Sequence, residues 1–427
     1  MRDRKNRLTG FIQRMYITWD SFIANDLFTY ASAGAYSFLL SSLPILLMVI
    51  VILVRILNTS PEVLRNLIEA NNLISKSVDL SPIIQSVRWI RSIGVFEVIL
   101  GVSIFWMARR FFASIQQSMI VIYHKRGRLM SFRENIAVIV GEILLIIVIS
   151  ATTTFFIAGN TLFNSAFMKQ IFPPIFFRLF RNLFRFVPLA ILFGFLFLVY
   201  LYTPKTRPQT RVSFFSALAC TLSFALVQLV FTSFINMTTY NLIYGILSNV
   251  IVILLEVYFF FFLFLFFAQF QYVVQFFESF LLSRLYLLPA YDDPSLANQL
   301  QRILFCEPPF FYNRYAMRAG AGQTVFTIGD DSTELYYVCR GIVRVTMPNQ
   351  IVEIGPGGIF GEFSSFIGGN RTGTAVAQTE SVLLKIPERL FQETIEVDGA
   401  MSRRTLRVIS DYVRKNAKTP LPEYHDV

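Results

Sequence analysis

Two short stretches near the C-terminal end carry the residue types that bind a phosphorylated sugar. A glycine-rich run from Gly355 ends at Gly361-Glu362, and a guanidinium group follows at Arg371. If Gly361 and Glu362 open a short helix, its first backbone N–H groups point outward and favour a phosphate. Arg371 can form a bidentate, charge-assisted pair with that phosphate. The carboxylate of Glu362 can accept a hydrogen bond from a sugar hydroxyl.

Short β-type runs separated by glycines must position these side chains. The runs cover residues 323–327, 335–339, 341–347, 351–354, 373–378 and 382–386. Many short strands with tight turns predict a small β-barrel or jelly roll. We expect helices at 295–304 before the strands and at about 389–415 after them.

The two stretches resemble the phosphate-binding cassette of the cyclic-nucleotide-binding domain family, within a match from about Ser295 to Lys415. Residues that fall where this family places its first hairpins are Gly329, Asp330, Glu334, Leu335, Tyr336, Val338, Gly341, Val343 and Val345. The resemblance implies a regulatory cyclic nucleotide, cAMP or cGMP, whose ribose 2′-hydroxyl is held by Glu362 and whose phosphate is held by Arg371. The ligand-binding set that it implies is Gly361, Glu362, Phe363, Ser364, Arg371 and Thr372. Its candidates for reading the base are Thr372, Arg403, Arg404, Arg407 and Tyr412.

The cassette also departs from the family pattern. Ser364 and Ser365 stand where small and then aliphatic residues are usual, Asn370 replaces a frequent proline, and Gly373 replaces a frequent alanine. None of these changes removes a charge that the ligand needs. A second hypothesis stays open, in which the domain is degenerate, serves dimerisation or docking, and has Glu362 and Arg371 paired with each other.

The rest of the chain has the composition of a membrane protein. Of its 427 residues 54% are hydrophobic and 15% are charged, with 46 phenylalanines, whereas soluble domains carry roughly 25% charged residues. The formal net charge of +11 is typical of basic residues that orient membrane helices, and we expect no nucleic acid partner. The three cysteines and two histidines indicate neither a disulfide framework nor a metal site.

Six stretches are long and apolar enough to span a bilayer: 28–57, 93–123, 136–158, 182–202, 211–236 and 246–273. In the second, Arg109 and Arg110 break the apolar run. The bias of basic residues in the loops predicts a multi-pass membrane protein with its N-terminus in the cytoplasm, and an even number of spans puts the C-terminus on the same side. Before the first span, residues 11–26 have the pattern of an amphipathic helix at the membrane surface.

The membrane part resembles the YihY/BrkB family of six-helix inner-membrane proteins over about residues 15–280. The segments that carry the resemblance are the small-residue run 31–44, Tyr200 to Pro204, Tyr240 to Gly245, and Ala268-Gln269. The family is often labelled ribonuclease BN, but metal-assisted phosphodiester cleavage needs a cluster of carboxylates or histidines, which the membrane region lacks. We therefore expect no enzyme and no catalytic residue.

Ionisable residues inside a membrane are functional candidates. Glu256 lies well inside the sixth span. Arg178, Arg181 and Arg185 share i, i+3, i+7 spacing and hence one helix face, which favours either anchoring at the outer surface or binding of an anionic group. This stripe, or Arg55, is the expected partner of Glu256.

These observations predict a polytopic α-helical membrane domain followed by a cytoplasmic jelly roll with flanking helices. The expected parts are a YihY/BrkB-like domain at 1–280, a linker at 281–294, a cyclic-nucleotide-binding-like domain at 295–416 and a tail at 417–427. The favoured function is a transporter of a lipid or small solute that a cyclic nucleotide regulates. The alternative is a membrane scaffold, with homodimerisation among its functions. We find no pore-loop signature of an ion channel.

Overall fold

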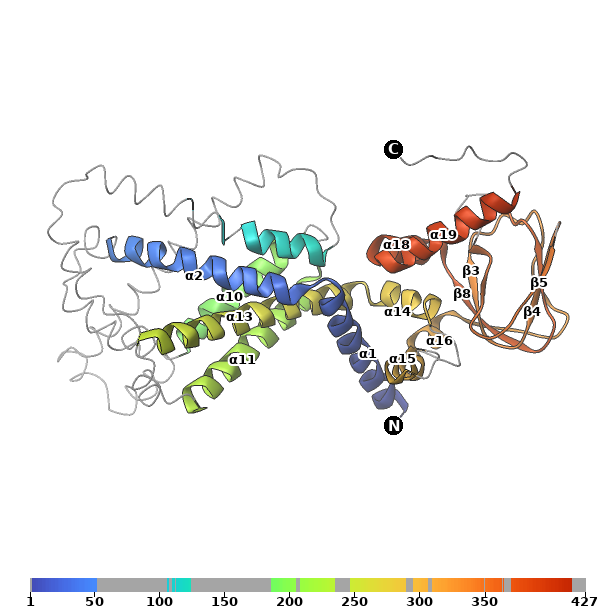
Figure 1. Ribbon diagram of the computed structural model, residues 1–427. Helices are drawn as coiled ribbons and strands as arrows, with labels where there is room; N and C mark the ends of the chain where they lie inside the picture. Colours follow the sequence, from blue (N-terminus) through green and yellow to red (C-terminus); the bar gives the residue numbers. More distant parts are fainter. Residues whose placement is uncertain are drawn as a thin grey trace, which may run out of the picture. The chain divides into compact units, whose positions relative to one another are not determined.

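The computed structural model describes residues 2–51, 106, 110–111, 113–123, 186–204, 208–234, 246–288, 295–305, 309–348, 350–362, 364 and 370–416 (Figure 1). These residues form two compact units. One unit, called the helical unit here, comprises 18–272. The other, called the sensor unit, comprises 1–17 and 273–427. Each unit is described by itself.

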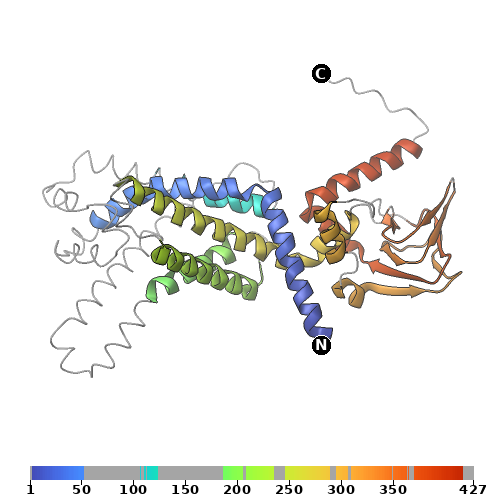
Figure 2. The same cartoon turned by 60° about the horizontal axis from the view of Figure 1, so that its bottom comes forward.

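Long apolar helices make up the helical unit. They are α2 (Leu27–Val51), α10 (Val187–Tyr202), α11 (Thr210–Phe234) and α13 (Ile246–Gln275). Figures 1 and 2 show α10, α11 and α13 running alongside one another. Within the described residues, two helical stretches are long and apolar enough to cross a membrane, Thr210–Ser233 and Ile251–Gln275. The helices predicted at these two places are confirmed, whereas most of the second span and all of the third lie outside the described residues.

The small-residue face of α2 is a packing surface. Ala31 and Ala35 are buried, and a Cβ added to Gly34 would lie 2.7 Å from the Phe261 ring of α13. Small residues let helix backbones approach closely in a membrane. The structure therefore supports close helix packing as the role of this face.

The sensor unit contains two antiparallel four-stranded sheets. The strands are β1 (Ala316–Ala319), β2 (Thr324–Phe326), β3 (Leu335–Arg340), β4 (Val343–Met347), β5 (Gln350–Ile354), β6 (Ile359–Phe360), β7 (Thr374–Ala377) and β8 (Ser381–Ile386). Their order is β1-β8-β3-β6 in one sheet and β2-β7-β4-β5 in the other. Alternate residues of β4 and β7 are buried, and together with Val338, Phe360 and Leu383 they form one hydrophobic core. The predicted jelly-roll type of architecture is confirmed.

Helices flank the sheets, and they differ from the prediction in more than one place. The C-terminal stretch forms two helices, α18 (Glu388–Val397) and α19 (Gly399–Asn416), rather than one. The break is at Asp398, whose backbone is extended and whose carboxylate accepts a hydrogen bond from the Ala400 N–H at 2.8 Å. An acidic side chain at this position satisfies the first amides of α19, as N-cap residues do.

Before the sheets lie α14 (Phe277–Tyr286), α15 (Leu296–Phe305) and α16 (Pro309–Tyr315). α14 starts one residue after the end of α13, and its second half extends beyond the expected boundary at residue 280. The N-terminal helix α1 (Arg2–Ala24) includes residues 11–24 of the predicted amphipathic stretch 11–26, and residues 25–26 form a turn. Its first part belongs to the sensor unit, where Gln13 donates a hydrogen bond to the carbonyl of Leu304 at 2.7 Å.

Candidate functional site

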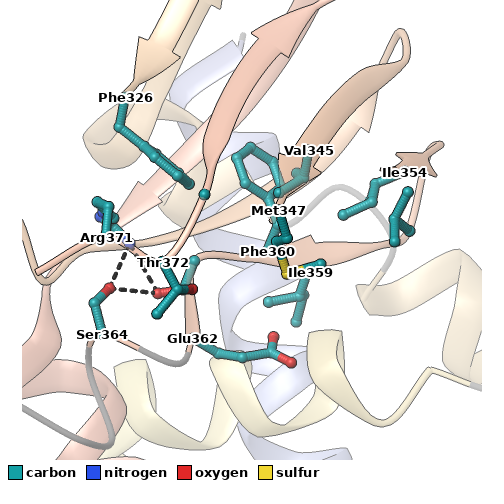
Figure 3. A pocket seen from close by; sticks show the side chains of 13 residues that line it. Phe326, Val345, Met347, Ile354, Ile359, Phe360, Glu362, Ser364, Arg371 and Thr372 are labelled. Atoms are coloured by element: carbon teal, nitrogen blue, oxygen red, sulfur yellow. Dashed lines mark hydrogen bonds between the residues drawn. The ribbon is translucent and has the colours of Figure 1, made fainter. Parts of the chain in front are cut away.

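A cavity of about 180 Å³ opens on the sensor unit at the glycine-rich turn (Figure 3). One side is apolar and the other is polar. The apolar lining is Phe326, Val345, Met347, Val352, Ile354, Ile359 and Phe360, and the remaining lining is Gly361, Glu362, Ser364, Arg371, Thr372 and Gly373. An apolar wall with a few convergent polar groups is the usual form of a small-molecule site. Because such sites measure roughly 300–1,000 Å³, a nucleotide would fill this cavity and project beyond it.

Gly361 has a backbone conformation that favours glycine. Its φ is +83°, and an added Cβ would lie 2.7 Å from an Arg371 nitrogen and 3.2 Å from the Glu334 carbonyl oxygen. Any other residue would be strained by the left-handed backbone and would displace the arginine. The glycine therefore lets the turn approach Arg371 closely.

Arg371 is the centre of a buried hydrogen-bond network. Its Nε donates a hydrogen bond to Ser332 Oγ at 2.8 Å. One terminal nitrogen donates to the Gly361 carbonyl at 2.9 Å and to Ser364 Oγ at 2.7 Å. The other terminal nitrogen donates to the Glu334 carbonyl at 2.6 Å. The guanidinium also lies 4.2 Å from the centre of the Phe326 ring. Burial lowers the pKa of Arg371. Most N–H groups of this guanidinium thus already donate hydrogen bonds to protein acceptors. A bound phosphate would have to share these hydrogen bonds or replace them.

The carboxylate of Glu362 points away from Arg371 (Figure 3). Burial raises the pKa of Glu362 to about 7, and the charge of Arg404 on α19 opposes this shift. The Arg404 guanidinium lies 5.0 Å from the centre of the Tyr286 ring, at the end of α14. Burial and the nearby Glu362 charge raise the pKa of Tyr286 to about 12. Glu362 therefore has a cation and a phenol from two flanking helices as its charged and titratable neighbours.

The structure brings together most of the residues that the sequence singled out. Gly361, Glu362, Ser364, Arg371 and Thr372 all line the cavity, whereas Phe363 lies outside the described residues. The degenerate-domain hypothesis assumed an ion pair between Glu362 and Arg371. In the described cassette Arg371 lies 3.9 Å from the Glu334 carboxylate instead, and the cation that acts on Glu362 is Arg404. Of the candidates on the last helix, Arg404 lies near the site.

Sequence reasoning missed the partners that hold Arg371 and Glu362. Ser332 and the Glu334 carbonyl come from the loop before β3, and Tyr286 comes from a helix far upstream. One residue of this loop, Asp330, could be found from the sequence, because its position matches the family pattern. The backbone N–H of Arg371 donates a hydrogen bond to the Asp330 carbonyl at 3.0 Å. Nothing in the sequence pointed to Tyr286.

In the membrane part, the structure describes the candidate Glu256 but not its expected arginine partners. Glu256 on α13 accepts a hydrogen bond from Gln228 Nε2 on α11 at 3.1 Å. Its expected partners Arg55, Arg178, Arg181 and Arg185 lie outside the described residues. In the part of the chain that the structure describes, no group of three or more His, Cys, Asp or Glu residues is placed to hold a metal ion.

Two family models match this chain, in the order that the sequence predicted. The model described as Virulence factor BrkB matches residues 18–279, and the cyclic nucleotide-binding domain model matches residues 317–398. Neither description is that of a catalytic domain. A cyclic nucleotide-gated potassium channel from Mesorhizobium japonicum is 38% identical over 72 residues, which are 17% of this chain and 20% of the channel. The chain thus spans only about a fifth of the length of this relative.

Solved structures match the C-terminal part of the chain. One, described by the words "A cyclic-GMP-dependent signalling pathway regulates bacterial phytopathogenesis", is 27% identical, with a TM-score of 0.23, and the match covers 26% of this chain and 94% of that one. The catabolite activator protein of Thermus thermophilus is 24% identical, with a TM-score of 0.23, and the match covers 26% of this chain and 55% of that one. The BrkB model covers more than half of the chain, so this protein belongs to the BrkB family and carries a cyclic nucleotide-binding domain after its membrane part.

Proposed function

We propose that this protein is a transporter of a lipid or small solute in the inner membrane, regulated by cAMP or cGMP bound in the sensor unit. The nucleotide-binding part of this proposal rests on the cavity of the sensor unit. There Gly361, Glu362, Ser364 and Arg371 line a space next to an apolar wall. Cyclic phosphate would bind at the Arg371 side, the ribose hydroxyl would donate to Glu362, and the base would lie on the apolar wall. This arrangement supports binding and requires no catalytic residue.

Regulation would pass through α14, which is continuous in sequence with the membrane helix α13. Ser279 donates to the Glu393 carboxylate at 2.9 Å and Ser283 donates to the Asp398 carboxylate at 2.5 Å. These bonds join α14 to α18 and to the break before α19. At its end, Tyr286 is close enough to Glu362 for the two to affect each other electrostatically. A ligand that engages Glu362 would therefore act on α14 directly, which gives the two-state element that regulation needs.

A second candidate function rests on the Arg371 network. Four hydrogen bonds from this guanidinium to protein groups would stabilise the domain without any ligand. That arrangement favours a scaffold whose C-terminal domain dimerises or docks. The two candidates differ in whether nucleotide binds.

Calorimetric titration of cAMP and of cGMP into the full chain in detergent separates them. At pH 8, where Glu362 with its pKa of about 7 is mostly ionised, we expect micromolar binding of one or both nucleotides. Glu362→Gln should weaken this binding about tenfold, because a charged hydrogen-bond acceptor for the ribose becomes neutral. Glu353→Gln is the matched control, since Glu353 lies on β5 and pairs with Arg344 at the surface. The absence of binding heat with both nucleotides would favour the scaffold function. An equal loss of nucleotide affinity in Glu362→Gln and Glu353→Gln would show that Glu362 does not contact the ligand.

A further inference from the structure

A second cavity of the sensor unit, of about 450 Å³, carries charged groups that the nucleotide site does not use. It lies at the start of α14. Its lining includes the charged residues Arg14, Glu278, Arg314, Arg389 and Glu393, together with Phe310. The residues come from α1, the end of α13, α14, α16 and α18. The cavity therefore forms where the two family-matched parts of the chain are joined.

Charged side chains of both signs line this cavity. It is lined by three guanidinium groups, Arg14, Arg314 and Arg389, and by two carboxylates, Glu278 and Glu393. Arg314 forms an ion pair with Glu278, whose other oxygen accepts from the Tyr315 hydroxyl at 2.8 Å. Guanidinium groups bind phosphate oxygens in a bidentate, charge-assisted geometry.

The first turn of α14 positions Arg14 at the cavity. Residues of that turn, Phe277 to Ser279, line the cavity, and the Arg14 guanidinium lies 4.2 Å from the centre of the Phe277 ring. A guanidinium that stacks on a ring keeps its N–H groups at the edge of that contact, where they can meet a phosphate oxygen.

The position along the chain indicates the source of the anion. Val274 and Gln275 belong both to the cavity and to the last turn of the apolar stretch Ile251–Gln275. The end of a membrane span lies at the level of the lipid headgroups. Phe310 at the cavity is 41% exposed, which suits contact with acyl chains better than with water.

We propose that this cavity binds the phosphate of an anionic phospholipid headgroup, on the same side of the membrane as the sensor unit. Arg14 and Arg389 are the proposed phosphate ligands, with Arg314 held at the rim by Glu278. The site is independent of the nucleotide proposal, because none of these residues lines the nucleotide cavity.

The test uses the full chain without nucleotide and a photoreactive phosphatidylglycerol, with labelled peptides mapped by mass spectrometry. We expect labelling at residues 274–279 and 310–315, and phosphatidylcholine should compete at least tenfold less well than phosphatidylglycerol. Arg389→Gln should lower the apparent affinity about tenfold through loss of a charge-assisted contact. Arg389 is exposed, so this variant should fold, and Arg344→Gln, at an exposed pair on β4, is the control.

Three results would overturn the proposal. Equal competition by the two lipids would show that charge does not select the ligand. An Arg389→Gln variant that matches Arg344→Gln would show that the cavity is not the labelled site. Competition by inorganic phosphate as effective as that by phosphatidylglycerol would assign the cavity to a soluble phosphate instead of a lipid.

Discussion

Replacing Arg371 by alanine should lower the free energy of unfolding of the jelly roll by about 3–5 kcal/mol, the usual cost of removing one partner from a buried charged network. The arginine side chain is 1% exposed, and its loss leaves the partly buried carbonyls of Gly361 and Glu334 and two serine hydroxyls without their donor. The loss of contact with the Phe326 ring adds to this cost. Hydrogen exchange of the β3 and β8 amides in the full chain, under mild denaturant, measures it separately from the membrane helices.

The matched control is Arg344→Ala. Arg344 also pairs with a carboxylate, Glu353 at 2.8 Å, but both side chains are largely exposed, so the expected cost is below about 1 kcal/mol. Similar effects of the two substitutions would contradict a structural role for Arg371. The large cost at Arg371 also means that failure of an Arg371 variant to bind nucleotide would not by itself identify a ligand contact, and Glu362→Gln is the cleaner binding test.

Glu362 should make the sensor unit less stable as the pH rises. Its pKa is raised by burial from an ordinary value of 4.5 to about 7, so the folded protein binds a proton more tightly than the unfolded chain. The stabilising effect of that proton is fully present below about pH 4.5 and is lost as the pH rises through about 7. At roughly 1.4 kcal/mol per pKa unit, the loss approaches about 3 kcal/mol by pH 8.

Glu362→Gln should remove most of this dependence, because the amide stays neutral throughout the range. The free energy of unfolding of the sensor unit, measured between pH 5 and pH 8 by the same amide exchange, should therefore fall with rising pH in the wild type but not in the variant. Arg404→Gln should steepen the fall, since Arg404 favours the charged carboxylate. A wild type and a Glu362→Gln variant with parallel pH profiles would contradict the burial of this carboxylate.

The sequence predicted those strands and helices whose own residues carry a clear pattern, and it missed those whose residues do not. The runs rich in β-branched residues, such as Val343 to Met347 and Ser381 to Ile386, form the predicted strands. β1 was missed because Ala316–Ala319 has no β-branched or aromatic residue, and β6 because it is only two residues long in a glycine-rich turn. The pair Asp398-Gly399, read as helix interior, ends one helix and starts another.

In the candidate site, the sequence predicted which residues come together but not how their side chains are oriented. Residue types and spacing were enough to place Glu362 and Arg371 at one cavity, because the cassette is a continuous stretch of chain. The orientation of each side chain was not predictable, because it depends on distant groups. Ser332 and the Glu334 carbonyl draw the guanidinium inward, and Tyr286 and Arg404 surround the carboxylate. The membrane part has no comparable continuous cassette, so its residue pattern predicted helices and their packing but no ligand contacts.

Hydrogen exchange of the full chain in lipid nanodiscs, with and without cAMP or cGMP, tests most directly whether nucleotide binding acts on the membrane-proximal helix. The predicted result is increased protection at β6 and the cassette, together with changed exchange in α14 and α19. Replacing both Ser279 and Ser283 by alanine should reduce the α14 change and leave the protection at β6, because the two serines join α14 to Glu393 and Asp398. Protection confined to the cassette, or no change with either nucleotide, would contradict regulation through α14.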